Sequence, residues 1–122
     1  MANRTHSLLV IDLEATCWQG DPPPGMQSEV IEVGIAELDT RALEITRAEA
    51  IFVRPQHSEV SPFYTRLTSI APEHVADAPT FPEVAERLRE EYRSLERPWA
   101  SWGDYDRLMF ERMTELHDCP HA

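Results

Sequence analysis

The chain has 122 residues, 42% of them hydrophobic, a length that supports one compact domain rather than two. Its 11 basic side chains are all arginines and stand against 22 acidic residues, giving a net charge of −11 at pH 7. This balance excludes broad electrostatic attraction to a phosphate backbone, because nonspecific nucleic-acid binding comes mostly from Lys and Arg contacts. Any nucleic-acid partner must therefore be held locally, through metal ions.

The sequence has no pattern typical of a membrane span, a signal peptide or a disulfide framework. No apolar run approaches the roughly 20 residues that cross a bilayer, and the first residues lead into a strand rather than a signal sequence. Cys17 and Cys119 lie far apart and form no CxxC pattern, which indicates free thiols. We expect a soluble, cytoplasmic protein without membrane contact.

The first half of the chain has strand patterns. Residues 7–14 begin as a continuous apolar run, typical of a strand buried on both faces, and end in acidic residues. The prolines and glycines of 18–25 predict a loop. Further strands are expected at 29–38 and 43–53, and the short turn between them predicts an antiparallel meander of three strands.

Helical patterns dominate the second half. Weak signals predict short helices at 61–68 and 72–76, and Thr80 with Glu83 forms a capping-box pattern for a helix at 81–95. A short buried strand is expected at 98–102 and a last helix at 105–116. The positions expected to face inward on the helices at 81–95 and 105–116 are Val84, Leu88, Tyr92, Leu95, Leu108, Met109, Met113 and Leu116.

An acidic pair ends the first strand. Asp12 and Glu14 are two residues apart, so both side chains leave the strand on the same face. Two carboxylates on a buried strand repel each other, and hard divalent ions such as Mg²⁺ or Mn²⁺ favour oxygen ligands of this kind. The alternative is a strand that simply reaches solvent at Asp12, and the spacing alone does not decide between the two.

The surrounding residues resemble a known family. Residues 10–18, Val-Ile-Asp-Leu-Glu-Ala-Thr-Cys-Trp, resemble the first motif of the DEDD (DnaQ-like) 3′→5′ exonucleases, in the form seen in the Eri-type RNA exonuclease branch. Segments at 29–34, 52–55, 61–70 and 78–84 resemble the same branch in the same order. The resemblance implies an α/β, RNase H-like exonuclease fold, with a mixed sheet of three antiparallel strands and then a parallel strand, and helices on both faces.

The second motif of this family is a small polar residue, a gap of three residues, and an aromatic residue followed by Asp. Ser101 and the pair Tyr105-Asp106 fit this spacing, although many relatives have Asn in place of Ser101. Asp104 competes with Asp106, but it is one residue short of the pattern and is better explained as a helix N-cap. The resemblance therefore favours Asp106 as the third carboxylate.

The resemblance also implies a two-metal phosphodiesterase that uses Mg²⁺ or Mn²⁺. Asp12, Glu14 and Asp106 would be its catalytic metal ligands, and its partners would be 3′ ends of single-stranded RNA or DNA, with RNA preferred. The residues expected to contact the terminal nucleotide are Ala15, Thr16, Leu67 and Thr68.

Two of the side chains near this site have alternative interpretations. Leu67 could pack against a base or sugar, or it could be an ordinary core leucine. Trp18 could stack on a base, or it could be a packing plug beside the proline-rich loop.

The third motif of the family has no counterpart in this chain. It consists of a histidine and, a few residues later, a fourth carboxylate, which supply the general base and the last metal ligand. His117, Cys119 and His121 form a His-x-Cys-x-His pattern, but no second cluster at zinc-site spacing accompanies it. We therefore expect a single exonuclease-like domain, residues 1–122, that is incomplete at its C-terminus.

Three explanations of the missing motif stay open: a shortened sequence, which we favour, a degenerate protein, or an assembly in which another chain covers the gap. The uncovered edge strand at 98–102 would allow self-association. We expect little or no nuclease activity from the 122 residues alone. The alternatives are a non-catalytic nucleic-acid or protein-binding module on this scaffold and an α/β domain with coincidental acidic residues, which would explain neither the segment order nor the acidic strand end.

Overall fold

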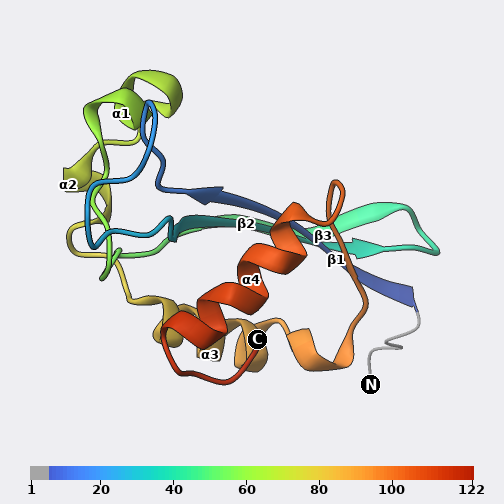
Figure 1. Ribbon diagram of the computed structural model, residues 1–122. Helices are drawn as coiled ribbons and strands as arrows, with labels where there is room; N and C mark the ends of the chain where they lie inside the picture. The colour runs from blue at the N-terminus through green and yellow to red at the C-terminus, as the bar shows by residue number, and fades with distance from the viewer. Residues whose placement is uncertain (1–5) are drawn as a thin grey trace.

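The computed structural model describes residues 6–122, and its centre is a four-stranded sheet in the order β3-β2-β1-β4 (Figure 1). Neighbouring strands pair antiparallel among β1 (Ser7–Ala15), β2 (Val30–Asp39) and β3 (Glu44–Phe52). The short strand β4 (Trp99–Ala100) pairs in parallel with β1. The expected meander followed by a parallel strand is therefore confirmed.

The helices begin close to the predicted positions. They are α1 (Pro62–Thr68), α2 (Pro72–Val75), α3 (Phe81–Glu91) and α4 (Tyr105–Leu116), with a 3-10 turn, η2 (Ser94–Glu96), after α3. The predicted capping residues lie at the start of α3, where Glu83 accepts hydrogen bonds from the Thr80 hydroxyl at 2.9 Å and from its N–H at 3.5 Å. Within residues 6–122, no helix is both long and apolar enough to cross a membrane.

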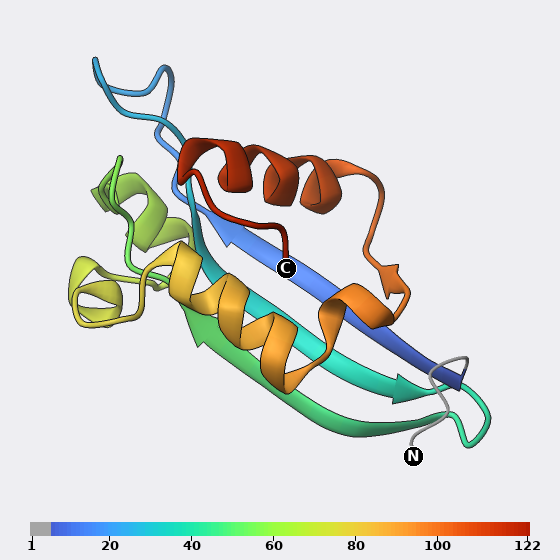
Figure 2. The same cartoon turned by 90° about the horizontal axis from the view of Figure 1, so that it is seen from below.

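The two long helices, α3 and α4, lie side by side across one face of the sheet (Figure 2). They pack on the inward side chains of β1, Leu9, Ile11 and Leu13, all of which are buried. Val10 points the other way and is 40% exposed. The expectation that the first strand is buried on both faces is therefore wrong, because residues 6–122 place no long helix on the second face.

The short helices α1 and α2 lie beyond one end of the sheet (Figure 1). They form a second core with the start of β2, made of Ile31, Val60, Tyr64, Ile70 and Val75. The coverage of the second face that the resemblance implies is thus limited to this end of the sheet, where Tyr64 of α1 reaches Glu14.

Two elements are shorter than predicted. The helix after Thr80 ends at Glu91 because Arg93 adopts a left-handed conformation with φ of 50°, so Leu95 is 66% exposed rather than inward. The strand predicted at 98–102 pairs only at Trp99–Ala100, and Trp102 is 97% exposed. In α4, the buried stripe consists of Met109, Phe110 and Met113, which leaves Leu108 54% exposed, contrary to prediction.

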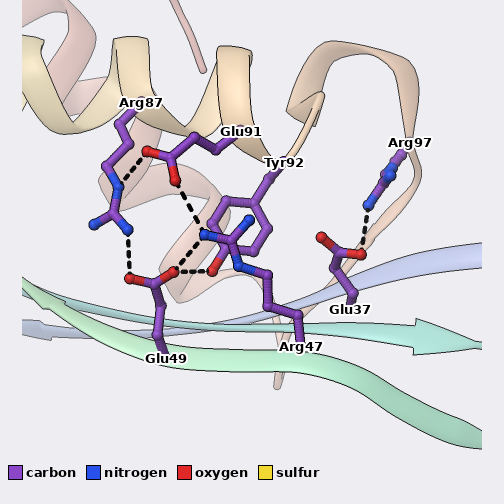
Figure 3. Close-up of polar contacts among 7 residues, drawn as sticks. All are labelled: Glu37, Arg47, Glu49, Arg87, Glu91, Tyr92 and Arg97. Atoms are coloured by element: carbon purple, nitrogen blue, oxygen red, sulfur yellow. Dashed lines mark hydrogen bonds and ion pairs between the residues drawn. The ribbon is translucent and has the colours of Figure 1, made fainter.

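A polar network fastens the edge strand β3 to α3 (Figure 3). Glu49 accepts hydrogen bonds from Arg47 at 3.0 Å, from Arg87 at 2.7 Å and from the Tyr92 hydroxyl. The Arg47 guanidinium also lies 4.2 Å from the Tyr92 ring centroid. Hydrogen bonding by Tyr92, followed by Arg87, lowers the pKa of Glu49. Charged residues that point inward from an edge strand also discourage pairing with another sheet.

Candidate active site

Asp12 and Glu14 lie on the face of the sheet that α3 and α4 do not cover. Their neighbours Ile11 and Leu13 point into the core, so the strand alternation directs both carboxylates to the open face. Asp12 pairs across the sheet with Gly34 of β2, and Glu14 pairs with Glu32. The first two predicted ligands are thus on one face, as the spacing indicated.

The start of α4 brings a third carboxylate to the same strand. Asp106 is only 7% exposed, and the nearby backbone N–H of Leu13 favours the charged form of its carboxyl group. Burial, and then the nearby charge of Asp12, raises the pKa of Asp106. The competing Asp104 is exposed instead; it makes no capping hydrogen bond and lies 3.6 Å from Arg107.

The surroundings of Glu14 include two residues that the sequence reasoning missed. Burial, followed by the charges of Asp12 and Glu32, raises the pKa of Glu14, whereas a 3.5 Å hydrogen bond from the Tyr64 hydroxyl opposes this rise. Glu32 belongs to the segment at 29–34 that carries the family resemblance, and pairing β2 with β1 in register would have placed it opposite Glu14. Tyr64 had no comparable signal, because it comes from α1, far away in sequence.

The donor set fits a hard divalent cation. Carboxylate oxygens are the ligands that Mg²⁺ and Mn²⁺ prefer, and in residues 6–122 no arginine or histidine forms an ion pair with Asp12, Glu14 or Asp106. The missing side chain of Gly34 leaves room beside Asp12, since a Cβ there would lie 3.3 Å from the Asp12 carbonyl oxygen. The three carboxylates are near enough to repel one another through their charges. Within residues 6–122, however, no three His, Cys, Asp or Glu side chains lie close enough together to hold a metal ion.

A cavity of 480 Å³ opens beside Asp106, between the edge of β4 and α4. Its walls include Ile11, Trp99, Arg107 and His121. The third carboxylate is therefore reached from the free edge of the sheet.

The candidate substrate residues fall into two groups. Leu67, near the end of α1, is 67% exposed and so is not the core leucine of the alternative interpretation. The Thr68 hydroxyl donates to the Tyr64 carbonyl at 2.9 Å and accepts from the Ile70 N–H at 3.2 Å, and Ala15 is partly buried against the main core. Leu67 is the candidate whose side chain is most available to a ligand.

The remaining candidate, Thr16, has hydrogen-bonding partners of its own. It is fully buried, its hydroxyl accepts a hydrogen bond from the Glu29 N–H at 2.9 Å, and it lies 3.0 Å from the Ser58 hydroxyl. Its carbonyl accepts from the Ser28 hydroxyl at 2.6 Å. The side chain of Thr16 is thus hydrogen-bonded inside the protein, although Thr16 also lines the pocket next to Trp18, and its contact with a nucleotide stays a prediction.

The C-terminal His-x-Cys-x-His residues do not converge. His117 packs against His57 and Phe81, whereas His121 packs against Trp99 and Phe110 at ring-centroid distances of 5.7 and 5.2 Å. Cys119 is a free thiol, as is Cys17, which agrees with the cysteine spacing. Trp18 lines a separate pocket of 380 Å³ together with Met26 and Arg112.

The sheet order and the carboxylates at the junction of β1 and α4 are those of an exonuclease domain. The Exonuclease family model matches residues 9–98, and the chain belongs to this family. The match ends before α4, so the placement of Asp106 rests on the structure and on the motif spacing.

The relatives identify the Eri-type branch that the sequence resembles. The chain is 39% identical over 88 residues to "ERI1 exoribonuclease 3" of Homo sapiens, covering 71% of this chain and 25% of that protein. It is 38% identical over 82 residues to "3'-5' exoribonuclease 1" of Homo sapiens, covering 66% of this chain and 23% of that protein. The chain thus spans about a quarter of the curated relatives it matches.

Solved structures agree on the fold. The nuclease domain of 3'hExo, a DEDDh family member bound to rAMP, superposes with a TM-score of 0.84 at 28% identity, covering 96% of this chain and 62% of that chain. Escherichia coli exonuclease I in complex with a dT13 oligonucleotide shares the fold at 12% identity, with a TM-score of 0.69, 93% coverage of this chain and 24% of that chain. The RNase H-like exonuclease fold is confirmed.

Proposed function

We propose that this chain forms part of a Mg²⁺- or Mn²⁺-dependent 3′→5′ exonuclease that hydrolyses phosphodiester bonds at single-stranded ends, with RNA preferred over DNA. The observation that carries the proposal is the position of Asp106, which the start of α4 brings next to Asp12 on the strand that also bears Glu14. The Eri-type relatives, whose names describe exoribonucleases, support the preference for RNA. A cytoplasmic location is part of the same proposal.

Each residue of the site would have a distinct role in metal or substrate binding. Asp12, Glu14 and Asp106 would hold the ions, and their mutual repulsion gives a cation a favourable place to bind. Bound ions supply charge neutralisation at the phosphate and lower the pKa of attacking water. Leu67 would pack against the terminal nucleotide, since it is exposed and has no packing role of its own.

A general base is lacking among the residues so far assigned to this site. His117 is buried against Glu29, and His121 packs against Trp99 and Phe110, so neither takes the role of the family's third-motif histidine. We therefore propose that the 122-residue chain alone has little or no nuclease activity. A metal-dependent degradation of RNA by the purified chain that Asp12→Ala abolishes would overturn this part of the proposal.

The metal site itself is tested by calorimetric titration of the chain with Mn²⁺. The wild type should bind, Asp12→Ala should lose binding, and Asp104→Ala should bind as the wild type does, because Asp104 is exposed and pairs only with Arg107. Absence of Mn²⁺ binding by the wild type would overturn the proposed site. Equal loss in the Asp104 variant would move the third ligand from Asp106 to Asp104.

A non-catalytic role is the second candidate, favoured by the finding that within residues 6–122 no three His, Cys, Asp or Glu side chains are arranged to hold a metal ion. One structure of a related 3'-exonuclease is described as showing 3'-end specific recognition of a histone mRNA stem-loop, so the scaffold can recognise RNA ends. Tight binding of single-stranded RNA that does not depend on Mn²⁺ or on Asp12 would favour this second candidate. We also propose self-association through the free edge of β4, which sedimentation would detect as a mass above that of one chain.

A further inference from the structure

A buried carboxylate outside the metal site connects three separate segments. Glu29, directly before β2, is fully buried, and its side chain accepts hydrogen bonds from the Gln56 N–H at 3.2 Å, the His57 N–H at 2.6 Å and the Ser58 hydroxyl at 2.7 Å. A carboxylate removed from water needs such donors to remain charged. All three donors belong to the 56–58 loop, and a further residue approaches the Glu29 carboxylate from another side.

That residue is His117, which lies directly after the end of α4. Its Nε2 lies 3.1 Å from Glu29 Oε2, and the two side chains are only 2% and 0% exposed. Nε2 makes no hydrogen bond in this position. Burial lowers the pKa of His117 and the nearby Glu29 opposes this change, so the two side chains form an ion pair only when the ring is protonated. The other ring nitrogen, Nδ1, lies 3.1 Å from the side-chain oxygen of Gln56, which fixes the ring from its opposite side.

The backbone of the same segment is joined to the end of β1. The Glu29 N–H donates to the Thr16 hydroxyl at 2.9 Å, and the Thr16 N–H donates to the Glu29 carbonyl at 2.8 Å. Arg112 of α4 donates to the Ser28 carbonyl. Residues 28–29 therefore contact both the strand end two residues beyond Glu14 and the second half of α4, the helix whose first turn carries Asp106.

Stability alone does not explain this polar link. The helix is already anchored by the buried side chains Met109, Phe110 and Met113, and a buried ion pair seldom stabilises a fold more than apolar residues of the same volume would. The hydrogen bonds of His117 Nδ1 with Gln56 and of Arg112 with Ser28 do favour one relative position of α4, because a shift would leave these groups unpaired. We therefore expect this polar link to fix the position of α4 rather than to strengthen its packing on the sheet.

We infer that Glu29 and His117 are positioning residues, which fix the end of α4 relative to β1 and thereby hold Asp106 beside Asp12 and Glu14. The inference rests on the proposed function insofar as those three carboxylates are the metal ligands. A helix moves as a rigid rod over this length, so release of its end at His117 tilts its start. The Leu13 N–H, which lies beside the Asp106 carboxylate, reports that tilt through its exchange with solvent.

The test uses the whole chain and the variants Glu29→Gln and His117→Gln. The first removes the charge while keeping the shape, and the second keeps Glu29 in place should the first fail to fold. Glu49→Gln is the control, because Glu49 is likewise a carboxylate with several donors, although only partly buried, and it joins β3 to α3, away from the site (Figure 3). Two quantities are measured: Mn²⁺ affinity, and the hydrogen-exchange rate of the Leu13 amide relative to that of the Leu88 amide in α3.

Both Glu29→Gln and His117→Gln should weaken Mn²⁺ binding by about tenfold, the order seen when outer-shell partners of metal sites are removed. Both should speed Leu13 exchange relative to Leu88, whereas Glu49→Gln should change neither quantity even where it lowers the melting temperature. Unchanged relative Leu13 exchange in a folded His117→Gln chain would overturn the inference. If the wild type does not bind Mn²⁺, the proposed function falls, and Leu13 exchange still decides the positioning role.

Discussion

The carboxylate of Asp106 lies beside the backbone N–H of Leu13, so the third carboxylate adjoins the strand that carries Asp12 and Glu14. The contact is possible because β4 pairs with β1 only at Leu9 and Val10, which leaves the edge of β1 free beyond that point. The first turn of α4 occupies this free edge. The Leu13 N–H thus favours the ionised form of Asp106, whereas the charge of Asp12 disfavours it.

Asp106→Asn should raise the melting temperature of the metal-free protein at neutral pH and abolish its stabilisation by Mn²⁺. The amide oxygen can still face the Leu13 N–H, while the repulsion with Asp12 disappears. For the wild type, an excess of Mn²⁺ of about 100 times its dissociation constant should add about 2.7 kcal/mol to the free energy of unfolding. Thermal melts with and without Mn²⁺ measure both effects, with Asp104→Asn as the control.

The same comparison has a pH dependence with a definite sign. The pKa of Asp106 is raised in the folded state, so its ionised form destabilises the metal-free fold above the unfolded pKa, and this destabilisation is lost as the pH falls through the raised value. The difference in melting temperature between Asp106→Asn and wild type should therefore shrink on acidification. A difference that grows at lower pH would contradict the assignment.

Tyr92→Phe should lower the free energy of unfolding by about 1 kcal/mol at neutral pH, since it removes the hydroxyl that donates to Glu49. This hydrogen bond is the largest cause of the lowered pKa of Glu49, so the stability that it contributes is present above the unfolded pKa and is lost as the pH falls through the lowered one. Urea unfolding at neutral and acid pH measures the difference. Mn²⁺ affinity should stay at the wild-type value.

Thr16→Val should destabilise the chain by about 1–3 kcal/mol, because the buried N–H of Glu29 would lose its acceptor. Chemical denaturation measures this loss, and Ser61→Ala, which removes the hydroxyl that caps α1, provides a comparison at another polar contact. A Thr16→Val chain as stable as the wild type but weaker in RNA binding would instead support the substrate role expected from the resemblance.

Leu67→Ala should change stability by no more than about 0.5 kcal/mol, as is usual for an exposed residue, yet weaken binding of a short single-stranded RNA in the presence of Mn²⁺. Leu95→Ala is a closely matched control, because Leu95 is 66% exposed and Leu67 is 67% exposed. Fluorescence anisotropy gives the two affinities. Equal affinities would remove Leu67 from the substrate site.

Much of the fold could be predicted because its signals are local. The strand alternation around Leu13, the capping pair at Thr80 and the spacing between Ser101 and Asp106 are properties of neighbouring residues. Helix and strand ends were less predictable: the left-handed conformation of Arg93 ends α3 before Leu95, and nothing in the spacing of Leu95 from Leu88 indicates it. Exposure of Trp102 likewise follows from the brevity of β4, which pairing with β1 determines.

The sequence by itself indicated the chemistry of the candidate site: a same-face acidic pair, Asp12 and Glu14, and, through the family resemblance, a third carboxylate at Asp106. Only the tertiary structure decided which groups surround that chemistry, because Glu32, Tyr64 and the Glu29–His117 contact come together through strand pairing and helix packing across long stretches of chain. It also decided that the side chain of Thr16, a candidate substrate residue, is buried and hydrogen-bonded to Glu29. Residue type and spacing define which groups can react, whereas burial and long-range contacts set their charge and their neighbours.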